Sequence, residues 1–137
     1  IILAALGAML WGLIRASAAP VQGRETLLAV WPLAMLAGWL TIAAAINVIT
    51  VLTAEGLIGH SGRAPAALLG VMTVTASGAG VAWATRQLAY AVPISWGLAA
   101  VYVAEQADQP AVGRAALAGA AVVLAVGVAA ARRSRAA

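Results

Sequence analysis

The stretch Gly38–Asn47, GWLTIAAAIN, decides the fold because it lies inside a long apolar segment that runs from Leu27 to about Thr53. It contains no charged residue, and its small residues allow another helix to approach closely. A helix rises about 1.5 Å per residue, so about 20 residues cross a bilayer core of ~30 Å. The segment is therefore predicted to be a membrane-spanning helix.

The composition extends this prediction to the whole chain. Of the 137 residues, 64% are hydrophobic and 9% are charged, which is more apolar surface than a soluble domain of this size can bury. Short turns separate five apolar stretches, at about residues 1–14, 27–53, 65–84, 88–104 and 115–131. We expect an all-α integral membrane helical bundle of five transmembrane helices, forming one domain over residues 1–137 with the lipid bilayer as its partner.

The first stretch is shorter than the others. Ile1–Ile14 would reach only about 21 Å as a helix, and the chain begins with Ile rather than Met. The stretch has neither the basic segment before it nor the cleavage site after it that a signal peptide requires. We therefore expect the first helix to be truncated and the chain to be the C-terminal part of a longer protein.

The charged residues predict an orientation in the membrane. All eight cationic side chains are Arg. The expected helix ends place six on one side and two on the other: Arg15, Arg24, Arg86, Arg132, Arg133 and Arg135 against Arg63 and Arg114. The Arg-rich side is expected to be cytoplasmic, which puts the C-terminus there and the Glu55–Ala64 loop outside. Because these residues mark segment ends rather than a basic patch with aromatics, no nucleic-acid partner is expected.

The sequence is poor in groups that perform catalysis. There is no Cys, and the single histidine, His60, lies in a Gly-rich loop without a nearby set of metal ligands. No ionisable residue is placed at the centre of a span. The hydroxyls of Thr73, Thr75 and Ser77 are expected to bond to the carbonyl one turn earlier and so to need no ligand. We expect a protein that is not an enzyme, with no metal site and no required cofactor.

One face of the second span has a composition that suits ligand binding. Trp31, Met35, Trp39, Ala43 and Asn47 recur every four residues, and side chains at that spacing share a helix face. The face suits a flat apolar ligand, with Trp for stacking, Ala for room and Asn for orientation. The alternative is that this face packs on neighbouring helices and that Asn47 bonds across to one of them.

The fourth span also combines a Trp with small residues, in the segment VPISWGLAAVY. Trp96 stands next to Gly97 deep in the span, which makes Trp96 a further candidate ligand-binding residue. Tyr90 and Tyr102 lie toward the two ends of the span. Tyr is enriched where a helix crosses the membrane–water interface, so both are expected to be interfacial anchors.

The second and fourth spans resemble a known family. WPLAMLAGWLTIAAAIN, at Trp31–Asn47, is similar to the PFSxYxGWxTxAxxAN segment of tryptophan-rich sensory proteins. These are bacterial relatives of the translocator family (TspO/MBR, peripheral benzodiazepine receptor). PISWGLAAVY looks like a later span of the longer members, and the order of the two segments agrees. The resemblance implies a multi-pass protein of the bacterial inner membrane that binds a porphyrin or other tetrapyrrole inside its bundle.

The resemblance also implies roles for individual residues. Trp39 and Ala43 match positions that face the ligand pocket, and Asn47 lies one turn further on. Val48 stands where many members have Tyr, which argues against sterol binding. In translocator proteins the similar helix is the last of five, so Ile1–Ile14 would be the end of a fourth helix with three helices before it.

Three functions remain open at this point. The leading hypothesis is an integral membrane protein of the tryptophan-rich sensory type that binds a tetrapyrrole or similar apolar ligand in a regulatory or carrier role. The alternative is an accessory structural subunit of a larger photosynthetic or respiratory membrane complex. A transporter is disfavoured. The expected assembly is a homodimer or a larger membrane complex.

Overall fold

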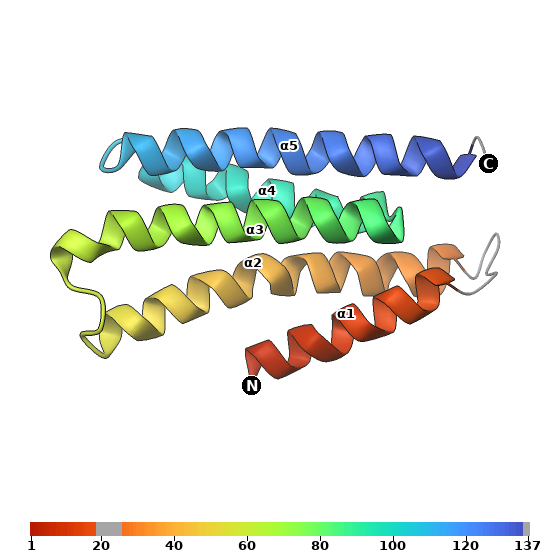
Figure 1. The fold of residues 1–137 in the computed structure, drawn as a ribbon, viewed down its shortest axis with the longest axis horizontal. Helices are drawn as coiled ribbons and strands as arrows, with labels where there is room; N and C mark the ends of the chain where they lie inside the picture. The colour runs from red at the N-terminus through yellow and green to blue at the C-terminus, as the bar shows by residue number, and fades with distance from the viewer. Residues whose placement is uncertain (19–25, 136–137) are drawn as a thin grey trace.

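The computed structural model describes residues 1–18 and 26–135, and these form a helical bundle (Figure 1). Five α-helices follow one another within the described residues: α1 (Ile2–Ala18), α2 (Trp31–Ala54), α3 (Arg63–Thr85), α4 (Leu88–Glu105) and α5 (Pro110–Arg135). A π-helical segment, η1 (Thr26–Val30), leads into α2, and a 3-10 turn, η2 (His60–Gly62), leads into α3. The predicted all-α fold class is confirmed, because the described residues contain no strand.

Four segments of the described chain are long and apolar enough to cross a membrane: Leu28–Ala54, His60–Thr85, Leu88–Glu105 and Pro110–Arg133. The first helix, α1, has 17 residues and would reach about 25 Å. It ends at Ala18, beyond the predicted Ile14, and α5 begins at Pro110, five residues before the predicted start at Ala115. A proline is well suited to the first position of a helix, where its missing N–H has no partner to lose.

Consecutive helices run in alternating directions (Figure 1). The helices α1, α3 and α5 point one way, and α2 and α4 point the other way, so that α2 and α4 are parallel. The helix α4 packs against both α5 and α2, while α1 lies at the edge of the bundle against α2. A two-residue turn joins α3 to α4, with Arg86 in the left-handed region at φ 55°. This tight turn makes α3 and α4 antiparallel neighbours.

Small residues make the closest contacts between helices. Gly119 of α5 lies directly against the hydroxyl of Thr75 in α3, and a methyl group at Gly127 would come within 2.6 Å of the Cβ of Ala91. Large apolar side chains point outward instead, and six of them are 63–73% exposed: Trp11, Leu28, Leu69, Met72, Trp96 and Val103. Because lipid tails are as apolar as these side chains, close backbone packing through small residues is the way that membrane helices associate.

The hydroxyl groups of α3 are satisfied within the helix, as predicted. Thr73 donates to the carbonyl of Leu69 at 2.8 Å, Thr75 to the carbonyl of Val71 at 2.8 Å, and Ser77 to the carbonyl of Thr73 at 2.7 Å. Each bond spans one helical turn. These side chains therefore need no external partner in an apolar environment.

The alternating helices gather the charged residues at two ends of the bundle. Arg15, Arg86, Arg132 and Arg133 lie at one end, which we call the arginine end. Arg24, predicted to belong to it, lies outside the described residues. The opposite end, which we call the acidic end, carries two Arg residues and three carboxylates: Arg63, Arg114, Glu55, Glu105 and Asp108.

Candidate functional site

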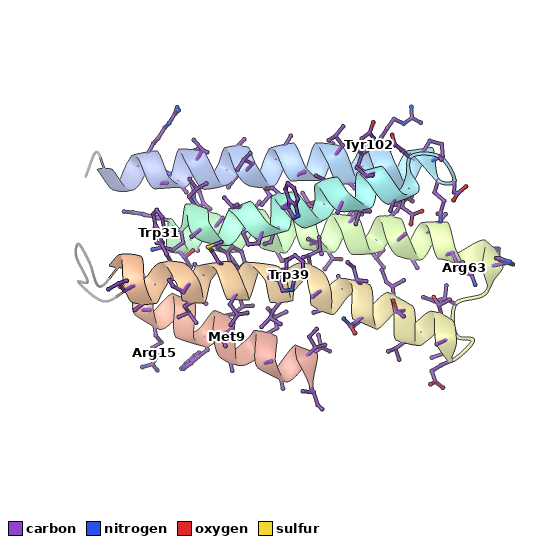
Figure 2. The ribbon with its side chains drawn as sticks, turned by 180° about the vertical axis from the view of Figure 1, so that it is seen from behind. Met9, Arg15, Trp31, Trp39, Arg63 and Tyr102 are labelled. Atoms are coloured by element: carbon purple, nitrogen blue, oxygen red, sulfur yellow. The ribbon has the colours of Figure 1, made fainter. Side chains whose placement is uncertain are left out.

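The side chains predicted to share one face of α2 lie on a face that points out of the bundle. Trp31, Met35 and Trp39 are 48%, 49% and 53% exposed, Asn47 is exposed and Ala43 is half-buried. Figure 2 shows Trp31 and Trp39 along this side of α2. The positions that α2 buries are different ones: Ala34, Ala37, Gly38, Thr41, Ile42 and Ala44. Helices of the described bundle therefore cover the predicted face only in part.

A hollow of about 380 Å³ lies between this face and α4. We call it the α2–α4 groove. Its walls come from two helices and contain no titratable side chain: Trp39, Ile42, Ala43, Ile46 and Asn47 from α2, and Gly97, Ala100, Val101 and Ala104 from α4. The volume lies within the range of about 300–1,000 Å³ that is usual for small-molecule sites. Three of the four candidate ligand-binding residues, Trp39, Ala43 and Asn47, are thus brought together.

The groove exists because α2 and α4 touch at one level and separate beyond it. At Gly38, a methyl group would strike the carbonyl oxygen of Tyr90 and come within 2.8 Å of Pro93 Cγ. At Gly97, a methyl group would come within 2.6 Å of Ile42 Cδ1. Beyond this contact α4 presents only Ala100, Val101 and Ala104 to the hollow. Two glycines therefore set the helix separation, and small side chains further along leave the space unfilled.

The remaining candidate residues differ in their surroundings. Asn47 donates from Nδ2 to the carbonyl oxygen of Ala43 at 2.9 Å, so this amide bonds within its own helix and not across to another described helix. Its amide oxygen has no partner among the described residues. Trp96 is 73% exposed and is not among the residues that line the groove, although its neighbour Gly97 is.

The prediction that Tyr90 is an interfacial anchor is wrong. Its side chain is fully buried, and its hydroxyl lies 2.8 Å from the Oγ1 of Thr41. Thr41 in turn donates to the carbonyl of Ala37 at 2.9 Å, so the Tyr90 hydroxyl is the donor in the bond between the two side chains. This bond links α4 to α2 close to the Gly38 contact. Thr41 is the residue from which this contact could have been predicted, because it is polar and lies on the same side of α2 as Gly38.

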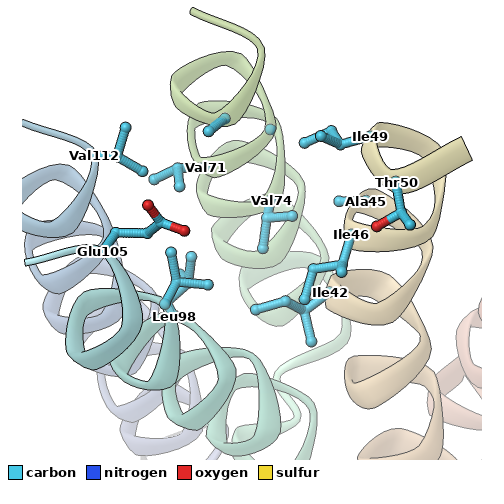
Figure 3. A pocket seen from close by; sticks show the side chains of 13 residues that line it. Ile42, Ala45, Ile46, Ile49, Thr50, Val71, Val74, Leu98, Glu105 and Val112 are labelled. Atoms are coloured by element: carbon cyan, nitrogen blue, oxygen red, sulfur yellow. The ribbon is translucent and has the colours of Figure 1, made fainter. Parts of the chain in front are cut away.

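Glu105 is not among the candidate residues named from the sequence. In the structure it lines an apolar cavity of about 150 Å³ near the acidic end of the bundle (Figure 3). We call this the Glu105 cavity. The other lining residues come from α2, α3, α4 and α5: Ile42, Ala45, Ile46, Ile49, Thr50, Ala67, Gly70, Val71, Val74, Leu98, Val101 and Val112. Glu105 is the single charged side chain in this lining.

A metal centre finds no support in the part of the chain that the structure describes. No group of three or more His, Asp or Glu side chains there is placed to hold a metal ion. His60 is exposed in the loop between α2 and α3. The α2–α4 groove and the Glu105 cavity are two places where the fold offers a ligand both space and specific polar groups.

Comparison with known proteins places this architecture in a family. The family model described as TSPO-like protein matches residues 1–129, which extend from the start of α1 into the last turns of α5. No curated protein and no solved structure matches the chain. The matched residues include Trp39, Ala43, Asn47 and the four apolar segments long enough to cross a membrane. The chain therefore belongs to the TSPO-like protein family and is a multi-pass membrane protein of the TspO type.

Proposed function

We propose that this protein binds a porphyrin or a similar flat apolar ligand in the α2–α4 groove, and that it acts as a regulator or carrier. The observation that carries the proposal is the groove itself, where Trp39, Ala43 and Asn47 line one hollow of about 380 Å³. Family membership supports the choice of a tetrapyrrole, because the resemblance of Trp31–Asn47 to tryptophan-rich sensory proteins implies that ligand class.

The chemistry of the lining favours a flat ring system. The indole of Trp39 offers a π-face for stacking, and aromatic pairs prefer offset-stacked or edge-to-face contacts. Ala43, Gly97 and Ala100 leave room for a ring to lie close to the helices. The free amide oxygen of Asn47 can accept one hydrogen bond, which would fix the orientation of a ligand that carries an N–H or O–H group.

The same lining favours binding over catalysis. General acid–base and nucleophilic catalysis both need a side chain that gains or loses a proton or attacks the substrate. The residues that line the groove are Trp, Ile, Ala, Asn, Gly and Val, and none of these does so. A role in holding, delivering or sensing the ligand fits these residues.

The proposal is tested by titrating the purified protein in detergent with a porphyrin and following the Soret absorbance of the ligand. We expect Trp39→Ala to weaken binding about tenfold, which corresponds to the loss of about 1.4 kcal/mol of stacking and apolar contact. Ala43→Leu fills the groove and should weaken binding to a similar degree. Trp31→Ala is the matched control, because Trp31 lies on the same face but outside the groove. Wild-type affinity in both groove variants would refute the proposal.

A second candidate function is supported by the part of the face that lies outside the groove. Trp31 and Met35 are about half exposed next to the groove, and large side chains of this kind are enriched at protein interfaces. An accessory subunit or a homodimer would cover them. Purification in mild detergent separates the candidates: a stable monomer that still binds porphyrin argues against the subunit.

A further inference from the structure

The Glu105 cavity combines an apolar interior with one carboxylate at its edge. Figure 3 shows the side chain of Glu105 extending from the end of α4 toward Leu98 and Val71, with Ile42 and Ile46 on the opposite wall. The cavity measures about 150 Å³. An engineered cavity of about this volume with an aliphatic and aromatic lining stays dry and binds benzene, so the space fits one small ring.

Glu105 also lines a second hollow that adjoins the cavity. This hollow, which we call the vestibule, measures about 540 Å³ and lies at the acidic end of the bundle. Ile49, Thr50, Ala67 and Glu105 line both spaces, so Glu105 stands at the junction between the apolar cavity and the more polar vestibule. A ligand placed here would have its apolar part and its polar part in different surroundings.

Two polar side chains of the vestibule accept hydrogen bonds and lack partners among the described residues. Glu105 is half-buried and forms no ion pair with any described residue. Gln109 lines the vestibule, and its Oε1 is buried without a hydrogen-bond partner among the described residues. A carboxylate that is partly removed from water and unpaired is stabilised by a cation with N–H donors. Both residues line the vestibule, and the backbone N–H of Gln109 donates to the carbonyl of Glu105 at 2.8 Å, so the two acceptors come from consecutive turns of the chain and suit a group with several such donors.

Arg63 also lines the vestibule, but it does not pair with the carboxylate of Glu105. Its side chain is exposed and lies at the tip of the bundle in Figure 2, without an ion pair to Glu105. It does not line the Glu105 cavity. The negative charge of Glu105 therefore remains available to a cation that enters from the vestibule.

We infer that the Glu105 cavity binds a small organic ammonium compound. The apolar ring or chain of the ligand occupies the cavity, and its ammonium group lies at the junction, where it donates to the carboxylate of Glu105 and to Oε1 of Gln109. A neutral hydrocarbon would fill the cavity but leave both acceptors unpaired, and a carboxylate ligand would be repelled by Glu105. This site adjoins the α2–α4 groove, with which it shares Ile42, Ile46 and Val101, but neither Glu105 nor Gln109 lines that groove.

The test uses 4-fluorobenzylamine as the probe and fluorine NMR as the readout, with the full chain in a maltoside detergent that carries no amine. Wild-type protein should bind the probe saturably. Glu105→Gln keeps the shape of the side chain and removes its charge, and it should weaken binding at least about tenfold. Asp108→Asn is the matched control, because it removes the same charge from an exposed residue nearby and should leave affinity within about twofold.

Two further arms make the result decisive. Ala67→Leu places bulk in the cavity and should also weaken binding of the amine, whereas 4-fluorotoluene should bind wild type and Glu105→Gln equally.

The ammonium could belong to a free amine or to the headgroup of phosphatidylethanolamine, and displacement of the probe by added phosphatidylethanolamine identifies the lipid as the source. Absence of saturable binding to the wild type, or equal binding to Glu105→Gln, overturns the inference. Porphyrin affinity of Glu105→Gln should stay unchanged. A failure of the ammonium site can therefore be distinguished from a failure of the proposed porphyrin site.

Discussion

Tyr90 and Thr41 form a short hydrogen-bond chain in the centre of the bundle. The Tyr90 hydroxyl donates to Thr41 at 2.8 Å, and the Thr41 hydroxyl donates to the carbonyl of Ala37 at 2.9 Å. The two side chains are not equivalent. If the Tyr90 hydroxyl is removed, the Thr41 hydroxyl still donates to the carbonyl of Ala37, whereas if the Thr41 hydroxyl is removed, the Tyr90 hydroxyl loses its acceptor. The order of donors therefore predicts unequal costs for the two deletions.

We expect Thr41→Val to destabilise the protein more than Tyr90→Phe does. The first leaves a buried hydroxyl without a partner, at a cost of about 1–3 kcal/mol, while the second removes one net hydrogen bond of about 0.5–1.5 kcal/mol. Unfolding in mixed micelles with increasing dodecyl sulfate, followed by circular dichroism, measures both. The double variant should be no less stable than Thr41→Val alone. Equal costs for the two single variants, or additive costs in the double variant, would contradict this account.

The residues that sequence reasoning could and could not locate differ in one physical respect. Trp39, Ala43 and Asn47 share a face because helix periodicity is local and fixes their spacing. The burial of Tyr90 depends on Thr41, which is 49 residues away in the chain, and on the close approach at Gly38. The cavity around Glu105 likewise needs side chains from four helices. Such sites depend on which helices pack together, and the local sequence pattern of one helix does not specify its neighbours.

At the scale of elements, the contact between α2 and α4 depends on Gly38. We expect Gly38→Ala to destabilise the protein by about 1–3 kcal/mol, because the added methyl group meets the carbonyl of Tyr90 and Pro93 Cγ and the helices must move apart. The same unfolding assay in mixed micelles measures the loss. The displacement should also change the shape of the α2–α4 groove, so porphyrin affinity should fall in parallel.

Gly80→Ala is the matched control for this substitution. Gly80 lies inside α3, and a methyl group there would meet no atom within 4 Å. Replacing an unobstructed helical glycine by alanine should be neutral or stabilising by up to about 1 kcal/mol. A loss of stability at Gly80 as large as that at Gly38 would show that helix propensity or lipid contact, and not the close approach of α2 and α4, controls the effect.

The extents of the helices followed from sequence because hydropathy and length are local properties. The second to fourth apolar stretches match α2, α3 and α4 to within a few residues, apart from the four-residue later start of α2. The errors lie where a polar residue was taken as a helix end. Arg15 lies within α1, which continues to Ala18, and a cation near a helix C-terminus is favourable because it complements the helix dipole.

At the scale of the whole molecule, the bundle separates its charges along one axis. The arginine end holds Arg15, Arg86, Arg132 and Arg133 and no acidic residue among the described residues, whereas the acidic end holds Glu55, Glu105 and Asp108 with two Arg residues. Cationic loops are retained on the cytoplasmic side during insertion. This asymmetry is the basis of the prediction from sequence that the arginine end, which includes the C-terminal end of α5, faces the cytoplasm.

The orientation is testable with single cysteines, because the chain has none of its own. Ser61→Cys lies in the exposed loop at the acidic end, and Ala84→Cys lies at an exposed position near the arginine end. In intact cells of a bacterial host, a membrane-impermeant maleimide should label Ser61→Cys, and Ala84→Cys should react only after permeabilisation. Labelling of both in detergent shows that each thiol is reactive. The reverse pattern would place the Arg-rich end outside and would mean that the four cationic side chains there do not determine insertion.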